Sequence, residues 1–292
     1  MSKEATSTIR SEFAHVVRVF FRHKLGVVGL VMLIVFAGAA VFAPAVAPRD
    51  PYEMDLASPF LPPGSSGYIL GTDNYGRDIL SRLIHGSRIS LLIGIVVVSI
   101  ATVIGSVLGL VAGYYGGFID NLVMRLVEVF YSFPFLILVI GVMAILGPSV
   151  FNVMIVLGLV SWPLYARLVR AQVMALKSED FVKAAGALGC SDARIMFRHI
   201  LPNVLTPVIV SATLGIPGAI LSSASLGFLG FGVQPPTPEW GAMVSEAKDF
   251  ILLNSNMIIW PGMCIFLVVL SFNFVGDALR DALDPRLAKQ LN

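Results

Sequence analysis

The side chains that could do chemistry are few in this sequence, and they are scattered. Its two cysteines, Cys190 and Cys264, stand in such different contexts that neither a disulfide nor a Cys/His metal site is expected. No lysine follows a glycine, so the phosphate loop G-x-x-x-x-G-K-[ST] is absent. The four histidines form no cluster and no H-E-x-x-H motif: His15, His23, His85 and His199. The sequence therefore predicts a protein that is not an enzyme, has no catalytic residue and holds no metal or nucleotide of its own.

The segment 178–203 carries the clearest local pattern. Ser178 precedes two acidic residues and is expected to cap a short helix. Gly189 is placed to end that helix in a left-handed conformation, and Ser191 can cap a second helix that stops before Pro202. The pattern predicts two helices joined at a glycine corner, although an alanine-rich connector without a further role is the alternative.

The composition indicates that these residues belong to a membrane protein. Of 292 residues, 57% are hydrophobic and 13% charged, and the mean hydropathy is +0.85. A soluble domain has about 25% charged residues, so this chain cannot be wrapped in a polar surface. The net charge of +2 excludes a dominant nucleic-acid-binding surface.

Six uncharged apolar stretches are long enough to cross a hydrocarbon core of about 30 Å. They are residues 25–47, 89–112, 129–147, 148–166, 203–232 and 257–276. The first imitates a secretory signal, but its apolar run is longer than about 15 residues and we expect it to remain as an anchor. The third and fourth abut at a glycine-proline turn, and Pro207 and Pro217 are expected to bend the fifth.

Lysine and arginine predict the orientation, since cationic segments stay in the cytoplasm. With the N-terminus inside, 15 of the 20 basic residues are cytoplasmic. The remaining five are external: Arg49, Arg77, Arg82, Arg88 and Lys248. Both termini are therefore expected in the cytoplasm.

Other features concern helix packing. Residues 78–86, in which Asp78 and Arg82 stand at i, i+4 pairing distance, read as an amphipathic helix on the outer membrane surface. Gly105, Gly109 and Gly113 permit close approach of another helix, either within this chain or from a sister subunit.

The spans contain no ionisable residue, which disfavours an ion-coupled carrier. Hydroxyl residues of the fifth span either join helices or line an aqueous path: Ser211, Thr213, Ser222, Ser223 and Ser225.

Segment 178–203 resembles the EAA motif of ABC-importer permeases, which reads Glu-Ala-Ala, three residues, Gly, nine residues, Ile-x-Leu-Pro. Matching positions are Ala184, Ala185, Gly189, Leu201 and Pro202, while Lys183 stands in place of Glu and His199 in place of Ile. In that family the motif forms a coupling helix that docks into a cleft of the ATP-hydrolysing subunit.

A second resemblance narrows the family to the dipeptide, oligopeptide and nickel importers. The segment 71–91 is similar to the one that precedes their permease core, and 225–241 and 276–285 are similar to them as well. Its motif residues are Gly71, Thr72, Asp73, Gly76, Arg77 and Asp78. The likeness extends over nearly the whole chain from about residue 25 and is closest to the C-type subunit of the dipeptide and oligopeptide systems.

The resemblance implies an all-α integral membrane protein, with six transmembrane helices in a type I (MetI-like) permease bundle and a cytoplasmic coupling helix. Its expected parts are 1–24 cytoplasmic, 25–47 first span, 48–87 external, 88–280 five-helix permease core and 281–292 cytoplasmic tail. Expected partners are a homologous second permease, two ABC ATPase subunits that hold ATP and Mg, an external solute-binding protein and membrane lipid. Peptides are the expected cargo and nickel or another small solute the alternative; a carrier or channel acting alone is the rival class.

Overall fold

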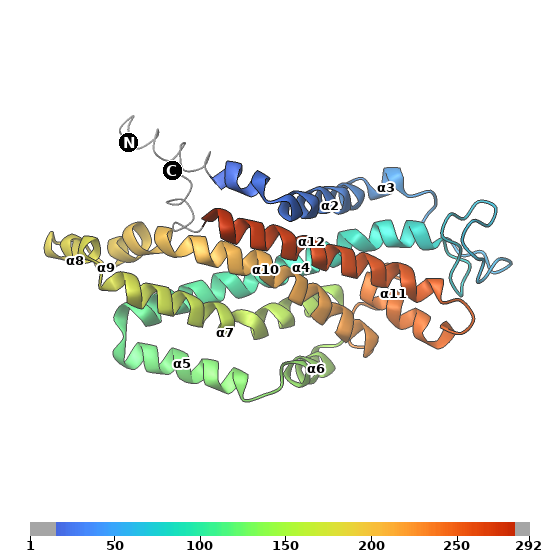
Figure 1. Ribbon diagram of the computed structural model, residues 1–292. Coiled ribbons are helices and arrows are strands. Elements are labelled where there is room, and N and C mark those ends of the chain that lie inside the picture. Colours follow the sequence, from blue (N-terminus) through green and yellow to red (C-terminus); the bar gives the residue numbers. More distant parts are fainter. Residues whose placement is uncertain (1–15, 284–292) are drawn as a thin grey trace.

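The computed structural model describes residues 16–283, and this part of the chain is helical without a β-strand. Figure 1 shows the long helices side by side in one bundle, with α2 along one edge and α5 and α6 along the opposite edge. After a helical segment at 16–22, the elements are α2 (Lys24–Val41), α3 (Ala43–Val46), α4 (Ile79–Tyr115), α5 (Gly117–Tyr131), α6 (Phe135–Leu146), α7 (Val150–Lys177), α8 (Asp180–Ala187), α9 (Asp192–Arg194), a π-helical turn (Ile195–Ile200), α10 (Leu201–Phe228), α11 (Trp240–Ala247), a 3-10 turn (Lys248–Phe250) and α12 (Asn256–Leu283).

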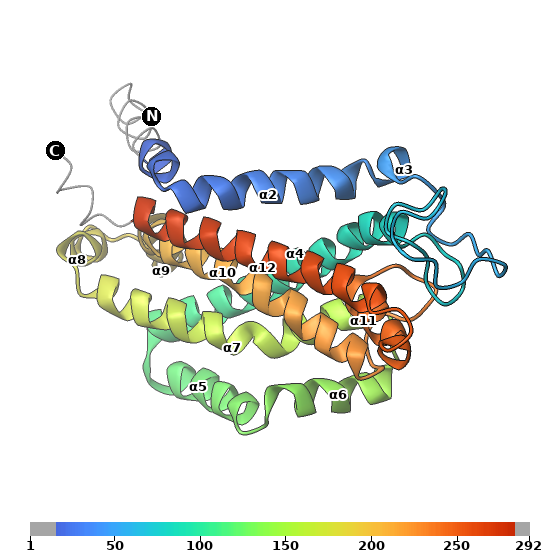
Figure 2. The same cartoon turned by 45° about the vertical axis from the view of Figure 1, so that its right-hand side comes forward.

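Two structures lie at opposite ends of this bundle. The lobe, residues 48–78, connects α3 to α4 at one end, next to α11. The corner loop, residues 178–191, contains α8 and lies at the other end (Figure 2). The predicted domain boundary at residue 88 lies inside α4.

Five helices in the described range are long and apolar enough to span a membrane, and α5 with α6 makes a sixth if the pair counts as one span. The predicted third span, residues 129–147, is not one helix: it covers the end of α5 and all of α6, which meet at 87°. The break falls at residues 132–134, where Pro134 has no backbone N–H to donate and disfavours helical geometry at the residue before it. The turn predicted between the third and fourth spans is confirmed, with Gly147 at φ +81° and Ser149 capping α7.

Two predicted boundaries are corrected. Residues 78–86 are not a separate surface helix: they begin α4, which continues unbroken into the second span. Likewise, the helix that starts at Asp192 does not stop before Pro202 but runs through the π-helical turn into α10. The wide turn stands directly before Pro202, whose ring and missing N–H disturb the hydrogen bonds of the preceding turn.

The glycine stripe on α4 packs within the chain, which decides between the two alternatives left by the sequence. A Cβ added to Gly105 would lie 2.6 Å from the carbonyl oxygen of Trp162, and one on Gly109 would lie 2.5 Å from that of Ala166. Gly113 faces α7 in the same way. The two helices therefore touch backbone to backbone along about two turns.

Candidate functional sites at the two ends of the bundle

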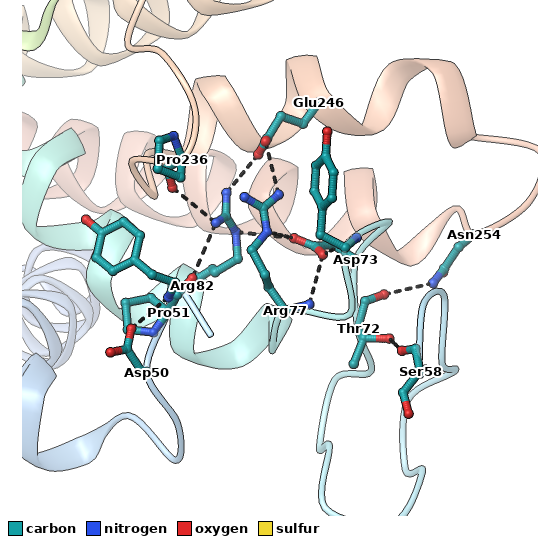
Figure 3. Close-up of polar contacts among 12 residues, drawn as sticks. Asp50, Pro51, Ser58, Thr72, Asp73, Arg77, Arg82, Pro236, Glu246 and Asn254 are labelled. Atoms are coloured by element: carbon teal, nitrogen blue, oxygen red, sulfur yellow. Dashed lines mark hydrogen bonds and ion pairs between the residues drawn. The ribbon is translucent and has the colours of Figure 1, made fainter. Parts of the chain in front are cut away.

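The lobe is organised around Thr72, whose side chain is fully buried. Its hydroxyl donates to the carbonyl oxygen of Ser58 at 2.7 Å and accepts from the backbone N–H of Leu61 at 2.8 Å. The carbonyl of Thr72 accepts from the side chain of Asn254, just before α12, at 3.4 Å (Figure 3). One threonine thus joins two segments of the lobe to the end of the bundle.

Two predicted motif residues are glycines because nothing larger fits. Gly71 and Gly76 have φ values of +83° and +74°, in the left-handed region. A Cβ on Gly71 would lie 2.1 Å from the carbonyl oxygen of Leu61, and one on Gly76 would lie 1.9 Å from that of Asp55. Both glycines are therefore required by the course of the backbone and not by a ligand.

A network of four buried charges joins the lobe to α4 and α11. Arg77 contacts Asp73 at 2.6 Å and Glu246 at 3.0 Å, and Arg82 contacts Glu246 at 2.7 Å and Asp73 at 3.6 Å. Both arginine side chains are 1% exposed, Asp73 7% and Glu246 13%. Figure 3 shows the two guanidinium groups lying between the two carboxylates. Two positive and two negative charges compensate each other, which is what allows this burial.

The remaining hydrogen-bonding groups of the network are also satisfied. Arg82 donates to the carbonyl oxygens of Pro236 at 3.2 Å and Pro51 at 3.4 Å. Asp73 accepts from the backbone N–H of Tyr75 at 2.8 Å and of Arg77 at 3.0 Å. These contacts close the network around a cavity of about 10 Å³, which is room for about one water and far too little for a peptide. The predicted motif residues Asp73 and Arg77 are therefore structural in this conformation.

Sequence reasoning missed Glu246, because it lies 164 residues from Arg82. It also paired Asp78 with Arg82 through their spacing, whereas Asp78 caps α4 by accepting from the backbone N–H of Ser81 at 2.8 Å. Glu246 is one of three acidic residues between α10 and α12, with Glu239 and Asp249, so no signal in the sequence singles it out.

A further carboxyl group at the lobe end of the bundle, that of Glu239, is buried without a cationic partner. Glu239 caps α11 by accepting from the N–H of Ala242 at 2.8 Å, and Ser90 on α4 donates to its other oxygen at 2.9 Å. Burial raises the pKa of Glu239, while the backbone donors and Ser90 act in the opposite direction. In the described residues no three His, Cys, Asp or Glu side chains gather into a possible metal site.

At the other end, the glycine corner is confirmed. Gly189 has φ +80°, and a Cβ there would meet no atom within 4 Å, so only the backbone conformation restricts this position. Ser191 caps α9 as predicted, accepting from the N–H of Arg194 at 3.4 Å. The predicted cap at Ser178 is wrong, because Ser178 ends α7 and Glu179 precedes α8.

Helix α8 has one buried and one exposed face. Val182 and Ala185 are buried against the start of the π-helical turn. Phe181, Ala184 and Leu188, at i, i+3 and i+7, face outward, with Phe181 45% and Leu188 85% exposed. We call these three residues the α8 stripe. The two predicted alanines thus point to opposite sides.

The other predicted residues of this segment surround the corner loop. Lys183 is exposed and lies 3.7 Å from Asp180 in a surface ion pair. Leu201 is half-buried and Pro202 exposed at the start of α10. The sequence motif did not include Phe181 and Leu188, although their helical spacing with Ala184 was available from the sequence.

Between the two ends, α7 borders two neighbouring hollows of about 280 and 320 Å³. They share Phe135, Ser161 and Leu164, so they form one groove along α6, α7 and α10. Ser222 of α10 borders it and donates its hydroxyl to its own helix at Gly218, 2.7 Å away. The residues that line the groove carry no charge.

Two family models match this sequence. The model for the binding-protein-dependent transport system inner membrane component matches residues 105–289, and that for the N-terminal TM domain of oligopeptide transport permease C matches residues 11–63. The dipeptide transport system permease protein DppC of Alkalihalophilus pseudofirmus is 46% identical, over 91% of this chain and 87% of its own length. The protein of the same name from Escherichia coli K12 is 46% identical, over 98% and 96%.

The fold also has a solved counterpart. A chain in the inward-facing MetNI methionine ABC transporter superposes with a TM-score of 0.57 at 22% identity, covering 70% of this chain and 96% of its own length. The likeness shows a shared fold.

Replacing Glu246 with Gln should destabilise the protein, because it leaves two buried guanidinium groups with one carboxylate. Breaking a buried ion pair costs about 3–5 kcal/mol. The matched control is Glu128→Gln, whose partner Arg125 is 3.1 Å away but whose pair is 63–81% exposed, so that its loss costs at most about 1 kcal/mol. Thermal unfolding of the purified protein in detergent measures both, and equal melting temperatures for the two variants would refute the structural role of the network.

Proposed function

The chain belongs to the family of binding-protein-dependent transport system inner membrane components, and we propose that its cargo is di- and oligopeptides, imported as the C-type permease of its system. It is a multi-pass inner-membrane protein with a type I (MetI-like) permease fold, and it is the non-catalytic transport component of an ABC transporter. The observation that carries the peptide proposal is the 46% identity over 98% of the chain to a dipeptide permease. A carrier or channel acting alone is thereby set aside.

An ABC importer permease works with ATPase and binding-protein partners. The proposed assembly contains this chain, a homologous second permease, two ATPase subunits that hold ATP and Mg, and an external solute-binding protein. The second permease is expected to cover the groove of α6, α7 and α10, which a single chain leaves open along one side. An uncharged groove closed in this way would carry peptides without selecting for side-chain charge.

The α8 stripe is the proposed contact with the ATPase. Phe181 and Leu188 are large apolar side chains held outward on a helix at the end of the bundle. Exposure of such residues outside the membrane favours a protein partner. Ala184 between them permits close approach, while Ala185 on the opposite face fixes α8 to the chain. Gly189 sets the angle between α8 and the helix that continues into α10.

The proposed orientation puts the corner loop in the cytoplasm and the lobe outside, with both termini cytoplasmic. This follows the excess of basic residues at the loop end. We propose that the lobe, held by its ion network, receives the binding protein or shapes the external gate. Of the predicted cytoplasmic segments 1–24 and 281–292, residues 1–15 and 284–292 lie outside the described residues.

Cysteine labelling tests the orientation. With Cys190 and Cys264 replaced by Ser, a cysteine at Leu252, which is 98% exposed beside α11, should react with a membrane-impermeant maleimide in intact cells. A cysteine at Leu188, 85% exposed, should react only after the membrane is opened, in cells that lack the ATPase subunits so that the proposed contact does not cover it. The reverse labelling pattern would show that the corner loop is external and the lobe cytoplasmic.

Uptake by the reconstituted complex tests the cargo. Proteoliposomes that contain both permeases and both ATPases, supplied with the binding protein, should import a labelled dipeptide with ATP. They should not import ⁶³Ni²⁺ under the same conditions. ATP-driven nickel uptake without dipeptide uptake would replace the peptide proposal with its alternative.

Gly189→Val should reach the membrane at near-normal levels and lose most of the dipeptide uptake. A β-branched residue at φ +80° costs about 1–2 kcal/mol or moves the corner, and either change misaligns the α8 stripe with the ATPase. Gly147→Val in the turn between α6 and α7 is the matched control, since Gly147 also has positive φ and open space around it and lies in neither the lobe nor the corner loop. Normal uptake by Gly189→Val at matched expression would make the corner loop a connector only.

A further inference from the structure

Both ends of the corner loop are fastened to one residue of α4. Lys177, the last residue before the loop, donates from its amine to the carbonyl oxygen of Tyr114 at 2.6 Å. Asp192, the first residue after it, accepts from the Tyr114 hydroxyl at 2.8 Å. The amine of Lys177 also lies 5.4 Å from the centre of the tyrosine ring. The loop therefore leaves and re-enters the bundle on either side of this tyrosine.

Tyr114 is well placed for such a role. It is the penultimate residue of α4 and is 9% exposed. Its ring belongs to the apolar cluster that contains Val182 and Ala185 of α8 and Ile195 of the π-helical turn. The neighbouring Tyr115 is 47% exposed and stands outside this cluster.

Helix α4 connects this contact to the opposite end of the protein. Its 37 residues form an unbroken helix of roughly 55 Å, at about 1.5 Å per residue. Arg82 in its first turn ties it to α11 through Glu246 and to the lobe through Asp73. The close contact with α7 at residues 105–113 restricts bending along the last third of the helix, which leads to Tyr114. A displacement applied at Tyr114 is therefore carried along the helix axis.

We propose that Tyr114 is a positioning residue that fastens the corner loop to α4, so that movement of α8 is transmitted along α4 to the lobe. The hydroxyl bond to Asp192 is the essential part, because among residues 16–283 it is the side-chain hydrogen bond that joins α4 to the far end of the loop. The inference rests on the proposed function in one respect, namely that α8 receives its movement from an ATPase.

The first test measures coupling in the assembled complex. Tyr114→Phe keeps the ring and removes only the hydroxyl. Loss of this hydroxyl loosens the loop from α4, so the ATP hydrolysed per imported dipeptide should rise about tenfold, which corresponds to about 1.4 kcal/mol. Tyr115→Phe is the matched control and should leave this ratio unchanged.

Variants of Asp192, which accepts the hydrogen bond from Tyr114, distinguish the loss of this bond from general damage to the protein. Asp192→Asn keeps an oxygen acceptor and should stay within about threefold of the wild-type ratio. Asp192→Ala removes the acceptor and should reproduce Tyr114→Phe. Because both changes remove one interaction, the double variant should be no worse than either single variant.

A second readout does not require transport. Cys190 lies in the loop between Gly189 and Ser191 and is half-buried. In a Cys264→Ser background, Tyr114→Phe should increase its rate of maleimide labelling several-fold, and Tyr115→Phe should not. Failure of the wild-type complex to import peptide would overturn the proposed function and leave this measurement valid. Unchanged Cys190 labelling in Tyr114→Phe, or an unchanged coupling ratio in a complex that does import, overturns the inference.

Discussion

The contact between α4 and α7 is the constraint on which the rest of the structure depends. In a membrane there is little hydrophobic force between helices, so association relies on close packing. Gly105 and Gly109 allow the backbone of α4 to touch the carbonyl groups of α7. With that contact made, α4 has one position and one tilt. Its two ends then determine where the lobe and the corner loop can attach.

The charges of the chain are distributed to suit this arrangement. The groove of α6, α7 and α10 carries none, whereas the lobe end buries two arginines and two carboxylates as a neutral set. Such a buried set adds little net stability. It favours one arrangement of the elements, because a buried charge that lacks its partner destabilises the protein. It therefore suits a junction among the lobe, α4 and α11 that must have a single geometry. Glu239 nearby is buried with hydrogen bonds alone, and the pKa of its carboxyl is raised.

Local sequence rules succeeded at two positions of the corner loop, although Glu179 and not Ser178 precedes α8. Gly189 was placed in a left-handed corner and Ser191 at a cap, and both are found there, because backbone strain and capping depend on a few neighbouring residues. The rules failed where a longer-range partner decided the outcome. The i, i+4 spacing predicts a pair between Asp78 and Arg82, but Arg82 forms its ion pair with Glu246 on α11. Pro134 was a local signal for a break in the third span that the hydropathy pattern concealed.

The sequence by itself determined the membrane class, the approximate spans and the family, because apolar runs and short motifs are readable along the chain. Tertiary structure alone decided which face each residue uses. It turned Ala184 outward and Ala185 inward, and it brought Glu246 to Arg77 and Arg82. It also placed Tyr114 between Lys177 and Asp192. The physical reason is that burial and charge compensation are settled between segments distant in sequence, and only the packing of α4 against its neighbours fixes which segments meet.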